Sequence, residues 1–133
     1  MPSFRRIEPT DVSPPGGGYV HAVAIPAGNE LVFVSGQVPE AIDGSVPEGF
    51  EAQARQAWHN VERTLSAAGC SLDDVAKITM HIADRSHREV NRAVRNDVLG
   101  DRRPALTVLV GTMWDERWLL EIEAIAVCQG SPS

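Results

Sequence analysis

The stretch from residue 119 to residue 127, LLEIEAIAV, constrains the fold of this chain more than any other segment. Seven of its nine residues are apolar, and the segment is short enough to be a single β-strand. Successive side chains of a strand point to opposite faces of the sheet. Both faces of this strand are therefore largely apolar, and we expect the sheet to be covered on both sides.

The two faces of this strand differ in what they can pack against. One face is apolar throughout and includes small residues that suit close packing against helices: Leu120, Ile122, Ala124 and Ala126. The other face mixes apolar and acidic side chains: Leu119, Glu121, Glu123, Ile125 and Val127. A sheet face this apolar rarely stays in water, so we expect oligomerisation to cover it. The two glutamates within it are the exceptions that need a reason.

The remaining hydrophobic patterns predict an α+β fold. Strands are expected at residues 19–25, 31–34, 76–82, 105–111 and 119–127, and helices at 51–68 and about 86–99. The turn residues PAGN join the first two strands as a hairpin, and TMWDER joins the last two. Residues 71–74 can form one helical turn, and Ser86 with Glu89 matches a capping box. This order predicts one mixed sheet with both helices packed on one face.

Length, charge and cysteine spacing narrow the class of protein. The 133 residues fit one domain, 1–133, with a frayed tail at about 129–133. A net charge of −6 argues against nucleic-acid binding, and no apolar run is long enough to span a membrane. The N-terminus lacks a signal peptide, so a cytoplasmic protein is expected. Cys70 and Cys128 lack a CxxC spacing, and we expect free, buried thiols there.

Three segments carry a resemblance to a known family. In order and spacing, LVFVSGQVP, EAQARQAWHNVERTLSAAG and LLEIEAIAV closely resemble the YjgF/RidA family, from about Tyr19 to Val127. The resemblance implies a chorismate-mutase-like fold and a homotrimer with its sheets inside and three ligand clefts between subunits. It also implies hydrolysis of reactive enamines and imines without a metal or bound cofactor. Some relatives carry the label of a ribonuclease or translation inhibitor.

The resemblance also assigns roles to individual residues. Glu121 matches a glutamate that positions the hydrolytic water, and Tyr19, Gly36 and Asn91 match ligand-binding positions. Active members carry an Arg that forks onto the substrate carboxylate, a geometry that Lys cannot copy. That position is Leu106 in this chain, and Val108 stands where many members have Cys. The nearby Arg102 or Arg103 could supply a replacement cation.

Three hypotheses about the chemistry stay open. The first is a RidA-like 2-imino acid deaminase, against which Leu106 argues, because losing the fork costs roughly 3 kcal/mol of transition-state binding. The second is an imine, enamine or amide hydrolase for a less anionic substrate, and the third a non-catalytic metabolite-binding trimer. A ribonuclease is disfavoured, since the four histidines fit no acid–base pair: His21, His59, His81 and His87. Glu123 is expected to be structural.

Overall fold

The computed structural model describes residues 4–128, which form eight strands and helices joined by loops and two 3₁₀ turns. The predicted tail at 129–133 lies outside the described residues. The elements are β1 (Arg5–Ile7), β2 (Ala22–Ala24), β3 (Glu30–Gln37), α1 (Phe50–Ala67), η1 (Leu72–Asp74), β4 (Val75–Ile82), η2 (Arg85–His87), α2 (Arg88–Leu99), β5 (Ala105–Val110) and β6 (Leu120–Cys128).

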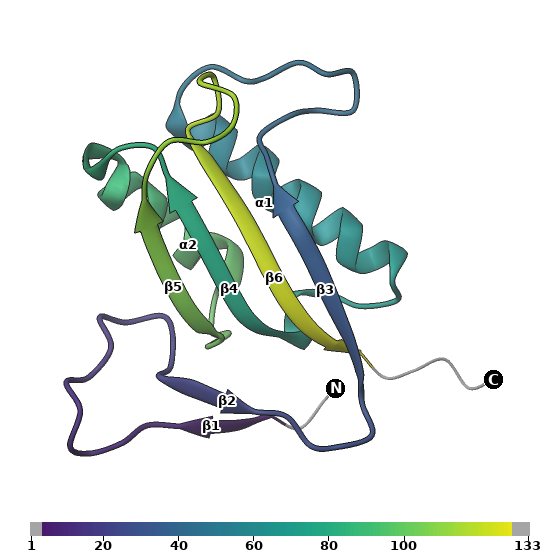
Figure 1. The fold of residues 1–133 in the computed structure, drawn as a ribbon, viewed down its shortest axis with the longest axis vertical. Helices are drawn as coiled ribbons and strands as arrows, with labels where there is room; N and C mark the ends of the chain where they lie inside the picture. Colours follow the sequence, from purple (N-terminus) through teal and green to yellow (C-terminus); the bar gives the residue numbers. More distant parts are fainter. Residues whose placement is uncertain (1–3, 129–133) are drawn as a thin grey trace.

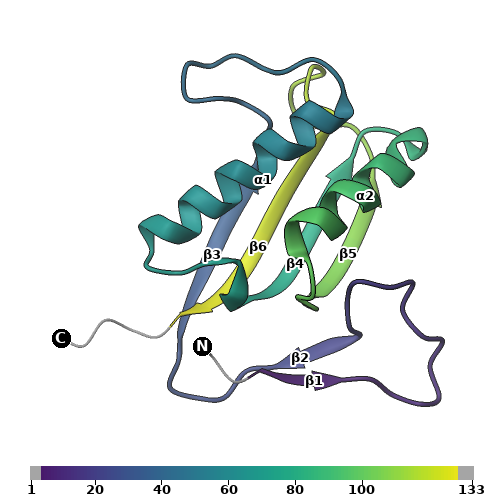
Figure 2. The ribbon, with the colours of Figure 1, turned by 180° about the vertical axis from the view of Figure 1, so that it is seen from behind.

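A four-stranded mixed sheet organises the molecule. Its strand order is β3-β6-β4-β5, with β6 antiparallel to both neighbours and β5 parallel to β4. Both helices lie on one face of this sheet (Figure 2), and no other part of residues 4–128 covers the opposite face in the view of Figure 1. The predicted α+β architecture, with two helices on one side, is confirmed.

The strand β6 lies at the centre because its sequence can be buried. The even positions Leu120, Ile122, Ala124 and Ala126 are all buried against the helices, as predicted. The core there includes Trp58, Val61 and Leu65 of α1. On the opposite face Glu121 and Ile125 are half-buried and Glu123 is exposed, whereas Val127 is covered by the chain itself. Burying each large apolar side chain stabilises the fold by about 2 kcal/mol.

Both predicted hairpins are wrong. Only Ala22–Ala24 of the first expected strand is extended, and it pairs with β1, which the sequence did not predict. The strand β3 pairs instead with β6, from Glu30 opposite Cys128 to Gln37 opposite Ile122. Likewise β5 pairs with β4 and never with β6. The cause is the apolar character of β6, which is buried best between two strands.

The predicted cap of the second helix is also wrong. The side chain of Asp84 accepts a hydrogen bond from the Ser86 amide at 2.8 Å and so begins η2, which leads into α2. His87, at the start of α2, makes no side-chain cap. The helical turn predicted at residues 71–74 does form, and it carries the capping box instead: the Ser71 amide donates to Asp74 Oδ2 at 2.8 Å.

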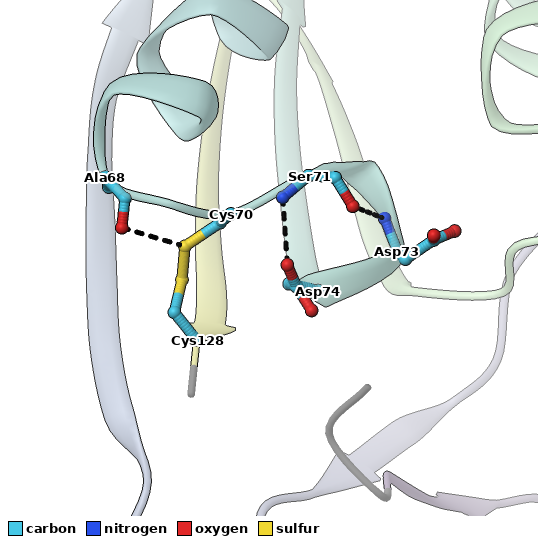
Figure 3. Close-up of a disulfide and its surroundings, with 6 residues drawn as sticks. All are labelled: Ala68, Cys70, Ser71, Asp73, Asp74 and Cys128. Carbon is cyan, nitrogen blue, oxygen red and sulfur yellow. Dashed lines mark hydrogen bonds between the residues drawn. A yellow bond between two sulfur atoms is a disulfide. The ribbon is translucent and has the colours of Figure 1, made fainter. Parts of the chain in front are cut away.

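The two cysteines are joined in a disulfide, which corrects the prediction of free thiols (Figure 3). Cys70 follows α1 and Cys128 ends β6, and their Cα atoms lie 5.7 Å apart. The sequence separation hid this pairing, because only the fold brings the end of β6 under the loop after α1. Within residues 4–128, Cys70, Asp74 and Cys128 form one group with metal-ligating atoms, but the sulfurs are bonded to each other.

A membrane-spanning helix was not expected from the sequence. Among the helices of residues 4–128, none combines the length and the apolar character that crossing a bilayer requires.

Candidate functional site

A cleft opens between β5, α2 and the loop before Val20. Leu106 and Val108 line it because they pair in register with the buried Ile78 and Met80 and so share the helix-side face of the sheet. The cavity volume is about 660 Å³. Its lining is Gly16, Gly17, Tyr19, Ile82, Arg85, Arg88, Asn91, Arg92, Arg95, Leu106, Val108 and Val110. Four of the predicted ligand-binding residues therefore meet here: Tyr19, Asn91, Leu106 and Val108.

The glycine-rich loop brings Tyr19 to this cleft. Gly18 has a φ of 79°, and a Cβ there would lie 2.9 Å from Asn96 Oδ1, so both its backbone conformation and the space favour glycine. The Val20 amide then donates to the Pro104 carbonyl at 3.1 Å, which fixes the loop beside the start of β5. The Tyr19 hydroxyl accepts a hydrogen bond from the Gly16 amide at 3.3 Å. This hydroxyl is thereby held at the edge of the cleft.

Asn91 is buried in the cleft wall with one polar atom unused. Its exposed fraction is 3%, and its Nδ2 lies 3.9 Å from Met80 Sδ. Its Oδ1 has no hydrogen-bond partner among residues 4–128. Buried polar atoms normally find a partner, so this oxygen is an unsatisfied acceptor in the wall of the cleft.

Four arginines form the α2 side of the cleft: Arg85, Arg88, Arg92 and Arg95. We call them the arginine wall. Their spacing of three, four and three residues places them on one face of the helical segment formed by η2 and α2. The net charge of −6 concealed this cluster in the sequence. No ion pair or hydrogen bond joins any of them to another described side chain, whereas Arg55, Arg102 and Arg117 all pair with carboxylates.

Arg95 is the buried member of the arginine wall. Its exposed fraction is 6%, and its Nε has no partner among residues 4–128. Burial, and then the neighbouring charge of Arg92, lower the pKa of the Arg95 guanidinium, while Tyr19 acts in the opposite direction. A guanidinium nevertheless stays protonated in proteins. Arg95 therefore presents a fixed positive charge deep in the cleft.

The cations expected from the sequence lie elsewhere. Arg102 donates to Asp73 Oδ1 at 2.8 Å and to the Leu99 carbonyl, and Arg103 contacts the Gly100 and Arg102 carbonyls. Neither residue lines the cleft. The hypothesis that Arg102 or Arg103 replaces the missing arginine is not supported by their positions in this chain.

Gly36 and Glu121 lie together on the uncovered face of the sheet. The pairing of β3 with β6 shifts register between Val34 and Gln37, and a Cβ on Gly36 would fall 2.6 Å from Glu121 Cδ. Glycine is therefore required for the carboxylate of Glu121 to lie over this bulge. Within one chain, Glu121 does not line the cleft that holds Tyr19 and Asn91. The predicted site residues are divided between two faces of the sheet.

His81 is a neighbour of Glu121 that the sequence reasoning set aside. It lies directly opposite Glu121 in the pairing of β4 with β6, and Glu123 lies opposite Thr79. All four side chains share the uncovered face, because directly paired residues point the same way. A second, smaller hollow of about 260 Å³ includes Lys77, Thr79 and Glu123. Pairing of β4 with β6 is what places His81 beside Glu121. The predicted hairpins assigned β6 to a different neighbour, so the sequence did not suggest this pairing.

Comparison with known proteins identifies the family. A family model described as Endoribonuclease L-PSP matches residues 10–128. The chain belongs to this family. It is the family that the sequence resembles, also called YjgF/RidA, and its curated relatives include RutC family proteins.

Two relatives illustrate the range of this family. The RutC family protein YjgH of Escherichia coli K12 is 34% identical over 126 residues, which cover 90% of this chain and 95% of the relative. A protein of Salmonella typhimurium named 2-iminobutanoate/2-iminopropanoate deaminase is 31% identical over 115 residues, covering 84% of this chain and 88% of the relative.

Solved structures agree with the fold. The Rid family protein YyfB of Yersinia pestis, a protein of unknown function, superimposes with a TM-score of 0.83 at 23% identity, covering 94% of this chain and 98% of that chain. Escherichia coli TdcF with bound serine superimposes with a TM-score of 0.70 at 30% identity, covering 94% and 99%. The fold of the YjgF/RidA family is thus shown for this chain.

Proposed function

We propose that the protein is a small-molecule hydrolase that deaminates an imine or enamine in clefts between the subunits of a homotrimer. One observation carries the proposal: Tyr19 and Asn91 line the cleft on the helix side, whereas Gly36 and Glu121 lie together on the uncovered face. A single chain cannot bring these two groups to one ligand. A neighbouring copy, placing its uncovered face against the cleft, would complete the site.

The uncovered face supports self-association. Phe33 is 69% exposed and Leu109 is 47% exposed, and Leu31 and Ile125 are neighbours of Phe33 on the same two strands. Figure 1 shows this face without any covering element. A sheet face of this kind is a typical interaction surface. Three copies with their sheets turned inward, as the family resemblance implies, would bury it.

The proposed chemistry is addition of water to a C=N bond. Glu121 accepts a proton from the water as the water oxygen bonds to the imine carbon, and the electron pair of the C=N bond moves to nitrogen, which takes up that proton. The same carboxylate then accepts the proton of the new hydroxyl group as a C=O bond forms and the C–N bond breaks. The leaving nitrogen takes up this second proton, so the products are ammonia and a 2-oxo compound. Asn91 Oδ1 supports this reaction because it is free to accept the N–H of the imine. A positioned carboxylate base contributes about a hundredfold or more to such a step.

Leu106 sets this chain apart from a deaminase with an arginine at the corresponding position. A leucine offers no donor to the carboxylate of a simple 2-imino acid, and burying a carboxylate unpaired is costly. We therefore propose slow hydrolysis of 2-iminobutanoate by the wild type. We also propose that the protein is located in the cytoplasm.

The alternative is a metabolite-binding trimer without catalysis. The observation that favours it is also Leu106, because the apolar wall of Leu106, Val108 and Ile82 can hold a ligand without polarising it. The name of the family raises ribonuclease activity as a further candidate. The net charge of −6 argues against it, because binding to nucleic acid relies on lysines and arginines that neutralise phosphates.

The test is clearance of imines that an amino-acid oxidase generates in the assay and that semicarbazide traps. We expect the wild type to compete with the trap for at least one 2-imino acid, and Glu121→Gln to reduce this rate about a hundredfold. Glu62→Gln, on the exposed side of α1 and outside the lining of the cleft, is the control for loss of one carboxylate and should retain the wild-type rate. Equal rates for wild type and Glu121→Gln would refute hydrolysis by this carboxylate. Binding without clearance would favour the alternative.

A further inference from the structure

The arginine wall concentrates positive charge in an acidic protein. Its members are four of the chain's 12 lysines and arginines, although the whole chain has a net charge of −6. The lining of the cleft includes no aspartate or glutamate. Like charges held together against a low-dielectric wall raise the local potential and attract anions. The positive charge of the wall is not balanced by a carboxylate in the lining, so the cleft favours a negatively charged ligand.

The deepest part of this wall offers both a donor and an acceptor. Arg95 Nε and Asn91 Oδ1 are buried and unpartnered in residues 4–128. They are one helical turn apart on α2, which places their Cβ atoms about 6 Å from each other. Leaving such groups buried and unpaired is costly, because each has lost its hydrogen bonds to water without gaining a partner. A small molecule with a carboxylate for Arg95 and an N–H for Asn91 would satisfy both.

The charges that a second copy could add do not cancel the wall. In the proposed assembly the uncovered face brings Glu121 and Glu123 together with Lys77, a net charge of −1. The four guanidiniums of the wall then keep three positive charges, four less one. A ligand with a single carboxylate would leave two of these charges unbalanced, whereas a ligand with two carboxylates would leave one.

We propose that the arginine wall selects small dianions, specifically 2-imino dicarboxylates, with Arg95 holding one carboxylate deep in the cleft and Arg85, Arg88 and Arg92 holding the second at the rim. That the ligand is an imine rests on the function proposed above. In this proposal the guanidinium that binds the carboxylate comes from α2, through Arg95. In active relatives it comes from the position on β5 that is Leu106 in this chain. A planar guanidinium can bind a carboxylate through two parallel hydrogen bonds.

The cleft fits a small molecule better than a nucleic acid. The sheet side of the cleft is apolar, through Ile82, Leu106 and Val110, and offers a surface for the carbon chain of a metabolite. Only 6% of Arg95 is exposed, so a phosphate of a polymer bound at the surface would not reach it. A cavity of about 660 Å³ suits a compound of metabolite size.

The experiment measures equilibrium binding, which needs no turnover. Isothermal titration calorimetry compares 2-oxoglutarate, a dianion, with 2-oxobutanoate, a monoanion, on the wild-type protein. These stable 2-oxo acids are the oxygen counterparts of the imines. We expect the dianion to bind at least about tenfold more tightly, with an affinity that falls as salt is added. Selective binding of the dianion without imine clearance would support the role proposed for the arginine wall and would refute only the proposed hydrolysis.

Three variants locate the binding. Arg95→Lys keeps the charge but loses the fork, and should weaken 2-oxoglutarate about tenfold. Arg92→Gln removes an exposed member, so it tests the wall even where an Arg95 variant does not fold. Arg63→Gln removes an equal charge from the exposed side of α1 and should change nothing.

Equal affinity for the two oxo acids, binding of neither, or an equal loss in Arg63→Gln would overturn the proposal. So would a single-stranded RNA oligonucleotide that binds more tightly than 2-oxoglutarate and loses affinity in Arg92→Gln.

Discussion

The two faces of the central sheet show opposite electrostatics on one backbone. On the helix side, Leu106 and Val108 of β5 line a cleft together with four arginines and no carboxylate. On the uncovered side, Glu121 and Glu123 of β6 lie among Phe33 and Ile125, with His81 and Lys77 on the neighbouring strand. Because side chains alternate along a strand, one sheet can carry both environments without bringing them together.

This division teaches that neither face is a complete site. The helix side presents arginines but no carboxylate, and the uncovered side presents carboxylates but no cleft of comparable size. Complementary charge would also favour contact between the helix-side cleft of one copy and the uncovered face of another. The following changes perturb the two faces separately, beginning with one that should leave their difference intact.

Removing the disulfide should have the largest effect on stability. For a sequence separation of 58 residues, the chain-entropy argument gives a loss of about 4 kcal/mol in the free energy of unfolding. Urea unfolding of the double variant Cys70→Ser/Cys128→Ser measures this change, and reduced wild type is the control. Binding of 2-oxo acids to folded protein should not change, because neither cysteine lines the cleft. An unchanged free energy of unfolding would show that the bridge is not formed in solution.

A charge on β3, at one edge of the uncovered face, should abolish assembly. Phe33→Asp places a carboxylate where a neighbour would bury it, at a cost of about 3 kcal/mol or more for each contact. Light scattering at micromolar concentration should report a trimer for the wild type and a monomer for the variant. Val90→Asp is the matched control, because Val90 is also an exposed apolar residue, at 39%, but lies on α2. A monomeric wild type would contradict the proposed trimer.

The contact of Gly36 with Glu121 can be tested by a double-mutant cycle. Gly36→Ala should destabilise the wild type by about 2 kcal/mol, because the added Cβ overlaps the Glu121 carboxylate. The same substitution in a Glu121→Ala background should be nearly neutral, and Glu121→Ala by itself should change stability by only about 1 kcal/mol. Thermal unfolding of the four proteins provides the cycle. Additive effects would mean that the side chains do not interact.

The smallest expected change concerns the arginine that the sequence lacks. Leu106→Arg should raise the clearance of 2-iminobutanoate about tenfold, equivalent to about 1.4 kcal/mol, because the new guanidinium can pair with a single carboxylate. Leu106→Met is the control for altered packing. The preference for dianions should narrow in the Leu106→Arg variant. A wild type that already clears 2-iminobutanoate as fast as the variant would show that Leu106 is no defect.

The sequence predicted the burial of elements better than their pairing. The alternation in β6 identified Leu120, Ile122 and Ala124 as the buried face, because burial follows directly from the period of two along a strand. The same period does not say which strand lies alongside. The turn chemistry of PAGN suggested a local hairpin, whereas the non-local pairing of β3 with β6 buries more apolar surface.

The sequence named the residues of the candidate site but not how they are grouped in space. Tyr19, Asn91, Leu106 and Val108 meet in one cleft and Gly36 meets Glu121, whereas the roles of these residues stay a prediction. The arginine wall was missed because a net charge averages over the whole surface and hides a single helix face. The disulfide was missed for a similar reason, since Cys70 and Cys128 become neighbours only after the sheet has formed.

The place of β6 in the strand order has a consequence for how the protein is made. The last strand of the chain lies between β3 and β4, so these two strands acquire their shared neighbour only when residues 120–128 leave the ribosome. Until then β3 and the β4–β5 pair expose unpaired edges, which are prone to aggregate. Folding of the sheet must therefore await the synthesis of residues 120–128, and a chain that stops before β6 should depend on chaperones rather than fold.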